Sequence, residues 1–193
     1  MNANVGMRYP VYAPVSAYVP GTSITYGNGG VVAEAVSASV NWNRADSKFH
    51  GDDVELDSDN GVLGYTISFE PSGLSDTVRA ALLGETLATS DYEINDSAAP
   101  DVGFGYIRVM RTKSAGSTVT KYEGWWFRKL KFAISSEETR TKEQGIEWRI
   151  PTLEGAGAGV SLDSSGKIKF AMHRTFDTEA SAKSWLNSLA GIT

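Results

Sequence analysis

The sequence contains no cysteine and only two histidines, His50 and His173. Without cysteine the chain can form no disulfide, no zinc–thiolate site and no thiol nucleophile. Two histidines are too few for a histidine-rich metal site, and there is no Gly-x-Ser-x-Gly motif of a nucleophile elbow. We therefore expect no catalytic residues and no enzyme activity.

Long apolar runs are also missing. No stretch approaches the roughly 18 consecutive apolar residues that a membrane-spanning helix needs. The segment from Met1 to Pro10 lacks the basic region and apolar run of a secretory signal peptide. We expect a chain that is made in the cytoplasm and has no membrane partner.

Two segments resemble ligand-binding motifs without matching them. Counted from Asp57 as position one, glycine falls at position five and Ser68 at position twelve. A calcium-binding EF-hand loop needs glycine at position six and glutamate at twelve. The Gly/Ala run 155–159 lacks the spacing and the strand-to-helix context of a dinucleotide site. We predict no metal site and no cofactor, with a weak, irregular cation site near Asp57 as the alternative.

Aromatic and apolar residues are abundant. Hydrophobic residues make up 41% of the 193 positions and aromatic residues 10%, enough for a sizeable core. Five Trp, eight Tyr and seven Phe favour strands, and twenty Gly indicate many turns. The composition therefore predicts a mainly β protein.

Apolar and polar residues alternate in several segments, which is typical of half-buried strands. Such strands are predicted near residues 36–42, 63–69, 102–111, 119–134, 146–150 and 168–172. In the first two, the apolar faces are Val36, Ala38, Val40 and Trp42, and then Leu63, Tyr65, Ile67 and Phe69. In 119–134, one face is predicted to hold Tyr122, Trp126, Leu130, Phe132 and Ile134, and the other Lys121, Glu123, Trp125, Phe127, Lys129 and Lys131.

Two short helices are predicted beside the strands. The first begins after Ser75 as N-cap and ends at Gly84. The second runs from an N-cap at Asp177 to Gly191, with Ala182, Trp185, Leu186 and Leu189 on its apolar face. The expected fold is mainly β (α+β), a β-sandwich or barrel-like domain with one short internal helix and a C-terminal helix.

The domain layout follows from composition along the chain. Residues 1–20 carry Pro10, Pro14 and Pro20, and because proline is disfavoured in central strands we expect an extended N-terminal arm there. Residues 21–193 are expected to form a single β-rich domain. Within it, residues 43–61 are polar and acidic and predict a long loop.

Charge is unevenly distributed along a chain whose net charge is −5. The negative total argues against tight binding to nucleic acid over a broad surface. The loop 43–61 holds Asp46, Asp52, Asp53, Glu55, Asp57 and Asp59 with one base, Lys48, whereas residues 108–142 hold nine bases and three acids. Complementary patches suit contacts between copies of one protein, whereas for a lone monomer a well-solvated surface is the preferred explanation.

The segment from Phe132 to Gly155 resembles the major tail tube proteins of long-tailed, non-contractile bacteriophages. It contains an "EE-x-x-TK" turn in Glu137–Lys142 and an "I-E-x-x-x-P-T-L-x-G" strand in Ile146–Gly155. The preceding order is also similar: an alternating strand, an acidic loop, another strand, and a helix ending in Leu82-Leu83-Gly84. The similarity covers roughly residues 7 to 160.

The resemblance implies a structural virion protein that forms hexameric rings, which stack into the tube through which phage DNA passes without being bound. It implies partners among the tape measure, initiator and terminator proteins of the tail. The loop 43–61 would then reach the next ring, and the Pro-rich part of the arm, residues 7–20, would wrap a neighbour. From charge complementarity we predict that the acids of this loop meet Arg128, Lys129, Lys131, Arg140 and Lys142 of another copy. Lys48 is predicted to lie in the same inter-ring loop.

Two other functions remain open from the sequence. A carbohydrate- or receptor-binding β-sandwich would use Trp125, Trp126 and Phe127 as a platform for a sugar. A head–tail joining or tail-terminator protein would share the fold but form one ring without polymerising. Against the first alternative, Trp126 shares the parity of the core residues of its strand, and binding to a glycan array would favour it.

Overall fold

Most of the chain is β-strand. The computed structural model describes residues 2–51, 54–59, 61–88, 91–114, 117–136 and 150–193. In chain order the elements are β1 (Asn2–Val19), β2 (Ser23–Tyr26), β3 (Gly30–Val31), β4 (Ala35–Arg44), β5 (Ser47–Gly51), β6 (Val54–Asp59), β7 (Val62–Pro71), α1 (Asp76–Leu83), β8 (Thr86–Leu87), β9 (Tyr92–Glu93), β10 (Val102–Ser114), β11 (Ser117–Ser136), β12 (Thr152–Gly157), β13 (Val160–Ser161), β14 (Ile168–Lys169), β15 (Ala171–Phe176) and α2 (Glu179–Ala190). The prediction of a mainly β, α+β fold with two helices is confirmed.

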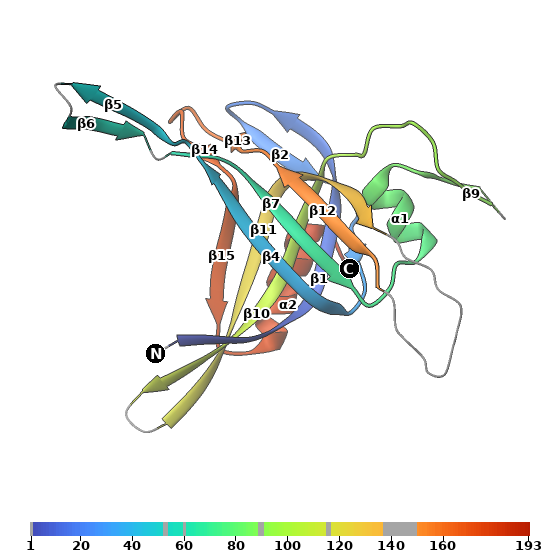
Figure 1. The fold of residues 1–193 in the computed structure, drawn as a ribbon. Coiled ribbons are helices and arrows are strands. Elements are labelled where there is room, and N and C mark those ends of the chain that lie inside the picture. The colour runs from blue at the N-terminus through green and yellow to red at the C-terminus, as the bar shows by residue number, and fades with distance from the viewer. Residues whose placement is uncertain (1, 52–53, 60, 89–90, 115–116, 137–149) are drawn as a thin grey trace, which may run out of the picture.

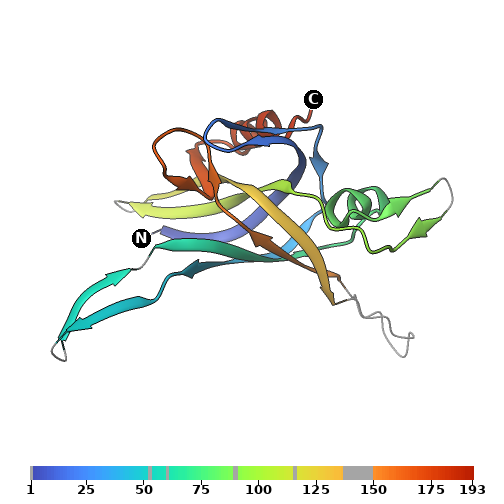
Figure 2. The ribbon, with the colours of Figure 1, turned by 90° about the horizontal axis from the view of Figure 1, so that it is seen from above.

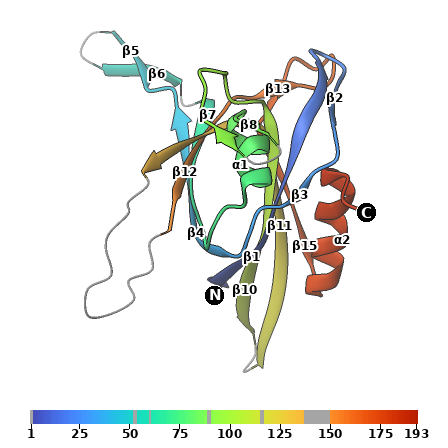
Figure 3. The ribbon, with the colours of Figure 1, turned by 90° about the vertical axis from the view of Figure 1, so that its right-hand side faces the viewer.

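One nine-stranded antiparallel sheet organises these elements. Seven strands follow the order β2-β1-β10-β11-β12-β7-β4, and the other two, β15 and β3, pair with β11 and β1. β11 is 20 residues long, so its first half pairs with β15 and its second half with β12. The sheet curls strongly, and β4 and β1 approach each other across its concave side (Figure 1 and Figure 3). Strong twist and curl of this kind bring distant strands around one core.

The main core fills the concave side of the sheet. Its largest fully buried side chains come from β7, β10, β11 and β12, among them Tyr65, Ile67, Phe69, Phe104, Phe127, Leu130, Phe132 and Leu153. Helix α1 lies at one end of the curled sheet (Figure 1 and Figure 2) and contributes Val78, Leu82 and Leu83 to this core. The predicted ends of α1 are confirmed: the Ser75 side chain accepts a hydrogen bond from the backbone N–H of Val78, and Gly84 takes the left-handed conformation.

A second core lies on the convex side, where α2 packs against the sheet. Trp126, Ile107 and Val11 of the sheet meet Ala182 and Leu186 of the helix, all fully buried. The predicted apolar face of α2 is largely correct, and its end at Gly191 is confirmed. The predicted N-cap was wrong by one residue, because Thr178 rather than Asp177 accepts the hydrogen bond from Ser181 N.

A β-bulge in β11 divides its side chains differently from the prediction. Phe104 and Val102 of β10 pair with Phe127 and Leu130 of β11, so β11 has one extra residue between these pairs. A bulge of this kind shifts the alternation of faces. Trp126 therefore faces α2, whereas Leu130 and Phe132 join Phe127 in the main core. The prediction that Trp126 shares a face with Leu130 and Phe132 was wrong.

The expected N-terminal arm is part of the sheet. β1 pairs with β10 from Asn2 to Pro14, and Val11, Tyr12 and Ala13 are buried. The prediction that residues 1–20 stand apart was wrong, because a register shift between Arg8 and Val11 accommodates Pro10 without a ladder hydrogen bond. Tyr9, in the same bulge, has a φ of 53°.

The predicted acidic loop contains regular structure. β5 and β6 form an antiparallel hairpin that projects away from the body of the protein (Figure 1 and Figure 2). β4 also departs from its prediction at one end, since a register shift beside Val36 leaves that side chain 56% exposed. The predicted strand 146–150 and the turn before it lie largely outside the described residues.

Candidate functional site

A buried carboxylate connects three strands at one end of the concave side. Glu123 of β11 is only 5% exposed. Its Oε2 accepts hydrogen bonds from Arg108 Nε and Trp125 Nε1, each at 2.9 Å. Its Oε1 lies 3.0 Å from His173 Nδ1 of β15. The His173 ring stacks on Trp125 with 4.7 Å between centroids, so the four side chains form one cluster, the Glu123 cluster.

The surroundings of Glu123 change its acidity. Burial by itself would raise the pKa of the carboxyl group, but the hydrogen bonds from Trp125 and Arg108 and the nearby charges outweigh burial and leave the pKa below its ordinary value. A buried carboxylate that stays ionised requires such donors. The cluster therefore stabilises the junction of β10, β11 and β15 through a charged group.

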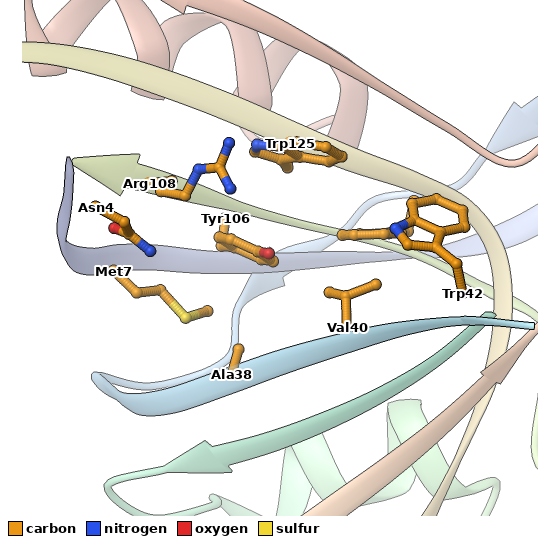
Figure 4. A pocket seen from close by; sticks show the side chains of 9 residues that line it. Asn4, Met7, Ala38, Val40, Trp42, Tyr106, Arg108 and Trp125 are labelled. Atoms are coloured by element: carbon orange, nitrogen blue, oxygen red, sulfur yellow. The ribbon is translucent and has the colours of Figure 1, made fainter. Parts of the chain in front are cut away.

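Beside this cluster, the concave side contains an open groove of about 240 Å³ (Figure 4). One wall comes from β4 and the other from β1, β10 and β11. The lining is mainly aromatic and aliphatic, with Arg108 on the far wall: Asn4, Met7, Ala38, Val40, Trp42, Tyr106, Arg108, Trp125 and Phe127. Trp42, 37% exposed, lies at the β4 wall. The groove remains open because β4 does not pair with the strand opposite.

No metal site or sugar platform forms around these residues. Among the described parts of the chain, no three His, Asp or Glu side chains gather closely enough to hold a metal ion. Trp126 and Phe127 are fully buried on opposite sides of β11. The aromatic platform of the alternative, sugar-binding hypothesis therefore does not form, since only Trp125 of the three side chains retains some exposure.

β4 forms one edge of the large sheet. Within the described residues, β4 has a hydrogen-bonded neighbour, β7, along one side only. It is ten residues long, and residues 35–43 contain no charge and no proline. Soluble proteins usually protect such edges with charged residues, proline, bulges or short strands. Apart from the bulge beside Val36 and the charge of Arg44 at its last position, β4 lacks these protections and can accept another strand.

The convex side of β4, β7, β12 and the second half of β11 forms a polar face. Strand alternation places there residues that are mostly small and uncharged: Ser37, Ser39, Asn41, Asn43, Thr66, Ser68, Glu70, Lys131, Ala133, Glu154 and Ala156. The register aligns Asn41, Thr66, Ala156 and Lys131 in one row across the four strands. Two acids against one base make this face weakly negative.

The predicted acidic residues lie on or next to the projecting hairpin. Asp46 is exposed directly before β5, Lys48 lies in β5, and Glu55, Asp57 and Asp59 lie in β6. Asp52 and Asp53 are outside the described residues. The structure thus places most of the predicted acids together on one two-stranded element.

The predicted basic partner residues are more dispersed. Arg128 and Lys129 lie at the β11 bulge and contact their own chain: Arg128 Nη2 is 3.4 Å from Met172 Sδ, and Lys129 Nζ is 3.2 Å from Asp101 Oδ2. Lys131 is exposed on the polar face. Arg140 and Lys142 are outside the described residues.

Sequence analysis missed two other cations that stand out in the structure. Arg111 and Lys113 are exposed near the end of β10, where β1, β10 and β11 extend beyond the body as a narrow tongue (Figure 3). Arg111 and Lys113 are two residues apart and directly precede the sequence Ser-Ala-Gly-Ser of residues 114–117, which predicts a turn. This position at the end of a predicted strand could have identified them. Neither forms an ion pair with another described residue.

Neither helix in the described part of the chain is long and apolar enough to cross a membrane. The geometry combines an unprotected sheet edge, a weakly negative polar face, the projecting β5–β6 hairpin and the tongue. Comparison with models of known protein families gives no match, and a comparison with curated proteins finds no similar sequence.

Proposed function

We propose that this chain is a structural virion protein, the major tail tube subunit of a long-tailed bacteriophage. In this role, copies form hexameric rings, and the rings stack into a tube through which DNA passes. The proposal joins the family resemblance of residues 132–155 to a geometry suited to self-assembly. Tape measure, initiator and terminator proteins would be its further partners, and the virion tail its location.

The observation that carries the proposal is the unprotected edge of β4. A ten-residue strand without charge over residues 35–43 offers backbone N–H and C=O groups to another strand. In a closed ring, each copy would cover the edge of the next, so no edge would remain to cause uncontrolled aggregation. A monomeric protein gains nothing from leaving such an edge unprotected.

The polar face supports the same role. A tube that lets DNA pass must not hold phosphates, and a weakly negative surface of Ser, Thr and Asn offers few cations to bind them. With Glu70 and Glu154 against Lys131, this face has the expected character. We assign it to the lumen, with the groove and the main core on the side away from DNA.

Electron microscopy and sedimentation velocity of the purified chain over a range of concentrations test the proposal. We expect rings or tubes, alone or after addition of a tail initiator complex. A chain that stays monomeric under all these conditions would refute the proposal. Single rings that never stack would instead favour a head–tail joining or terminator protein.

A further inference from the structure

The groove beside β4 contains a buried hydroxyl without a partner. Tyr106 of β10 is only 8% exposed, yet its hydroxyl makes no hydrogen bond with any described residue. Figure 4 shows this hydroxyl directed into the groove. Leaving such a group unpaired is unfavourable, and most buried polar groups in folded proteins have a hydrogen-bond partner. The groove therefore needs an acceptor from outside the chain.

Two further donors open into the same groove. The indole Nε1 of Trp42 has no acceptor within the part of the chain that the structure describes. Arg108 donates through Nε and Nη2 to Glu123, which leaves Nη1 without an acceptor among the same residues. Val40 and Phe127 supply apolar wall between these donors. The groove thus suits a partner that combines an apolar side chain with hydrogen-bond acceptors.

The size of the groove favours a protein segment over a free ligand. Its volume of about 240 Å³ is smaller than that of pockets for drug-sized ligands, which begin at about 300 Å³. It also runs along the free edge of β4, where an added strand would place alternate side chains in it. We therefore looked for a segment of a second copy with the matching chemistry.

The β8–β9 hairpin and the residues after it have this chemistry. Ile94, which follows β9, is 75% exposed, and Leu87 of β8 is 46% exposed. Residues 85–101 contain five acids and no base: Glu85, Asp91, Glu93, Asp96 and Asp101. Glu93 and Asp96 lie on either side of Ile94 in the chain, are exposed and form no ion pair with other described residues. An exposed isoleucine between two carboxylates matches a groove of apolar walls and unpaired donors.

Hydrogen bonds hold this segment in shape. Asn95 Nδ2 donates to Thr86 Oγ1 at 2.9 Å, and Asn95 Oδ1 accepts from the backbone N–H of Ser97 at 2.8 Å. These bonds tie the residue after Ile94 to β8 while the Ile94 side chain stays in solvent. A segment that is already ordered loses less conformational freedom when it binds.

The hairpin and the groove lie at opposite ends of the molecule. Figure 1 and Figure 2 share a horizontal axis, and in both the β8–β9 hairpin projects to the right. The N-terminus, which leads into Asn4 and Met7 of the groove, lies to the left in both. A second copy beside the first can therefore place its hairpin at the groove. Such head-to-tail contacts form a closed ring when successive copies are related by a suitable rotation.

We propose that residues 93–96 of one copy occupy the groove beside β4 of its neighbour in the ring. Ile94 packs against Val40, and the carboxylates of the segment accept hydrogen bonds from Tyr106 and Arg108. This inference rests on the proposed function and names the segment that covers the edge of β4.

A charge at the tip of the segment tests its role. Ile94→Lys places an ammonium group next to Arg108 in the groove, where burial is unfavourable. We expect ring formation only at a concentration about tenfold higher or more, measured by sedimentation velocity. Ile168→Lys is the matched control, because Ile168 of β14 is also exposed, at 53%, and lies outside the groove. It should assemble normally, and circular dichroism checks the fold of both variants.

A pair of tyrosine substitutions separates assembly from stability. Tyr106→Phe removes a hydroxyl that has no partner in the isolated copy, so the monomer should keep its melting temperature. Assembly should require a concentration about fivefold higher, because one hydrogen bond across the contact is lost. Tyr65→Phe should do the reverse, since the Tyr65 hydroxyl donates to its own chain at Lys129 O, 3.0 Å away. It should lower the melting temperature and leave assembly unchanged.

Mixing two defective variants tests the head-to-tail geometry. Ile94→Lys keeps an intact groove, and Val40→Lys keeps an intact segment 93–96. Each variant alone should remain monomeric at concentrations where the wild type forms rings. An equimolar mixture should form dimers, because one intact groove meets one intact segment. Misfolding of either variant would prevent this result.

The outcomes separate this inference from the proposed function. If Ile94→Lys forms rings as readily as the wild type, the inference is overturned while the tube role stands. If Val40→Lys is defective and Ile94→Lys is not, the groove binds another segment or a small anion, and the inference is again overturned. A mixture that stays monomeric would contradict the head-to-tail contact. If the wild type never assembles, both proposals fall.

Discussion

Arg108 and Glu123 face each other across β10 and β11, and the guanidinium donates two hydrogen bonds to one carboxylate oxygen, Oε2. Arg108 also lies over the Trp125 ring, with its Cζ 5.1 Å from the ring centroid. Together with His173 these side chains hold β15 against β11, and β15 leads directly into α2. One buried charge therefore stabilises the region where the two cores meet.

Replacing Glu123 by glutamine should destabilise the fold. Glutamine keeps the shape but removes the charge, and hydrogen bonds to charged groups contribute about 1.5–3 kcal/mol each. We expect Glu123→Gln to lower the free energy of unfolding by about 2 kcal/mol in urea titrations. Glu179→Gln, which breaks the exposed pair with Arg8, is the control and should cost under about 1 kcal/mol. Equal effects of the two substitutions would contradict the role of the Glu123 cluster.

The same carboxylate predicts a dependence of stability on pH. The pKa of Glu123 is lower in the folded chain than in the unfolded chain, so the unfolded state binds more protons between the two values. The contribution of Glu123 is present above the ordinary pKa that it has in the unfolded chain and is lost as the pH falls through its lower, folded pKa. Other carboxyl groups contribute to the same loss of stability in acid. For example, hydrogen bonds from Lys169 and Ser165 hold the pKa of Asp163 at about 2, and this contribution is the same in the wild type and in variants of Glu123.

Comparison with Glu123→Gln isolates the contribution of one residue. Urea titrations of both proteins at several pH values below 6 should give a stability difference that is constant at higher pH and shrinks in acid. A difference that stays constant down to the lowest pH at which both proteins fold would show that Glu123 does not titrate as described.

Docking of α2 should contribute strongly to stability. Leu186 is fully buried against Trp126 and its neighbours in the second core. Leu186→Ala leaves a cavity and should cost about 2–5 kcal/mol. Ser184 lies two residues before Leu186, on the exposed side of the same helix. Ser184→Ala should therefore change stability by less than about 0.5 kcal/mol. Thermal unfolding followed by tryptophan fluorescence measures both, and a small effect of Leu186→Ala would mean that α2 is not an integral part of the fold.

A charge that points inward from the edge strand should block strand addition without unfolding the monomer. Val40 lies on the groove side of β4. In an isolated copy, a lysine at this position can extend to solvent through the open groove, but pairing of a second strand would bury it. We expect Val40→Lys to remain folded by circular dichroism and to lose ring formation. Val40→Thr, which keeps a β-branched side chain of similar size, should assemble normally.

Parts of this fold were predictable because they depend on neighbours in the chain. Ser75 and Gly84 define α1 through one local hydrogen bond and one left-handed residue, and both signals are visible in the sequence. The N-cap of α2 was misplaced by one residue because Asp177 and Thr178 are both suitable, and Asp177 pairs with Lys121 instead. Which of the two residues caps α2 thus depends on Lys121, which is far away in the chain.

The face that Trp126 occupies was not predictable from periodicity. A bulge near Arg128 adds one residue to β11, and no residue type in the segment signals it. The same holds for β1, where a register shift lets Pro10 sit inside a sheet strand. In the Glu123 cluster, Glu123 lies 15 positions after Arg108 and 50 positions before His173 in the chain. Periodicity within one strand could not bring these residues together.

The sequence by itself determined the chemical limits and the local elements. It excluded thiol chemistry, it marked two helices by their capping residues, and alternation of side chains predicted a mainly β chain. Tertiary structure alone decided which strands pair, where the bulges fall, that β4 is an edge, and that the groove beside it and the β8–β9 hairpin lie at opposite ends. The physical reason is range: capping and alternation act over a few residues, whereas pairing, edge exposure and the placement of projecting segments depend on contacts between distant segments.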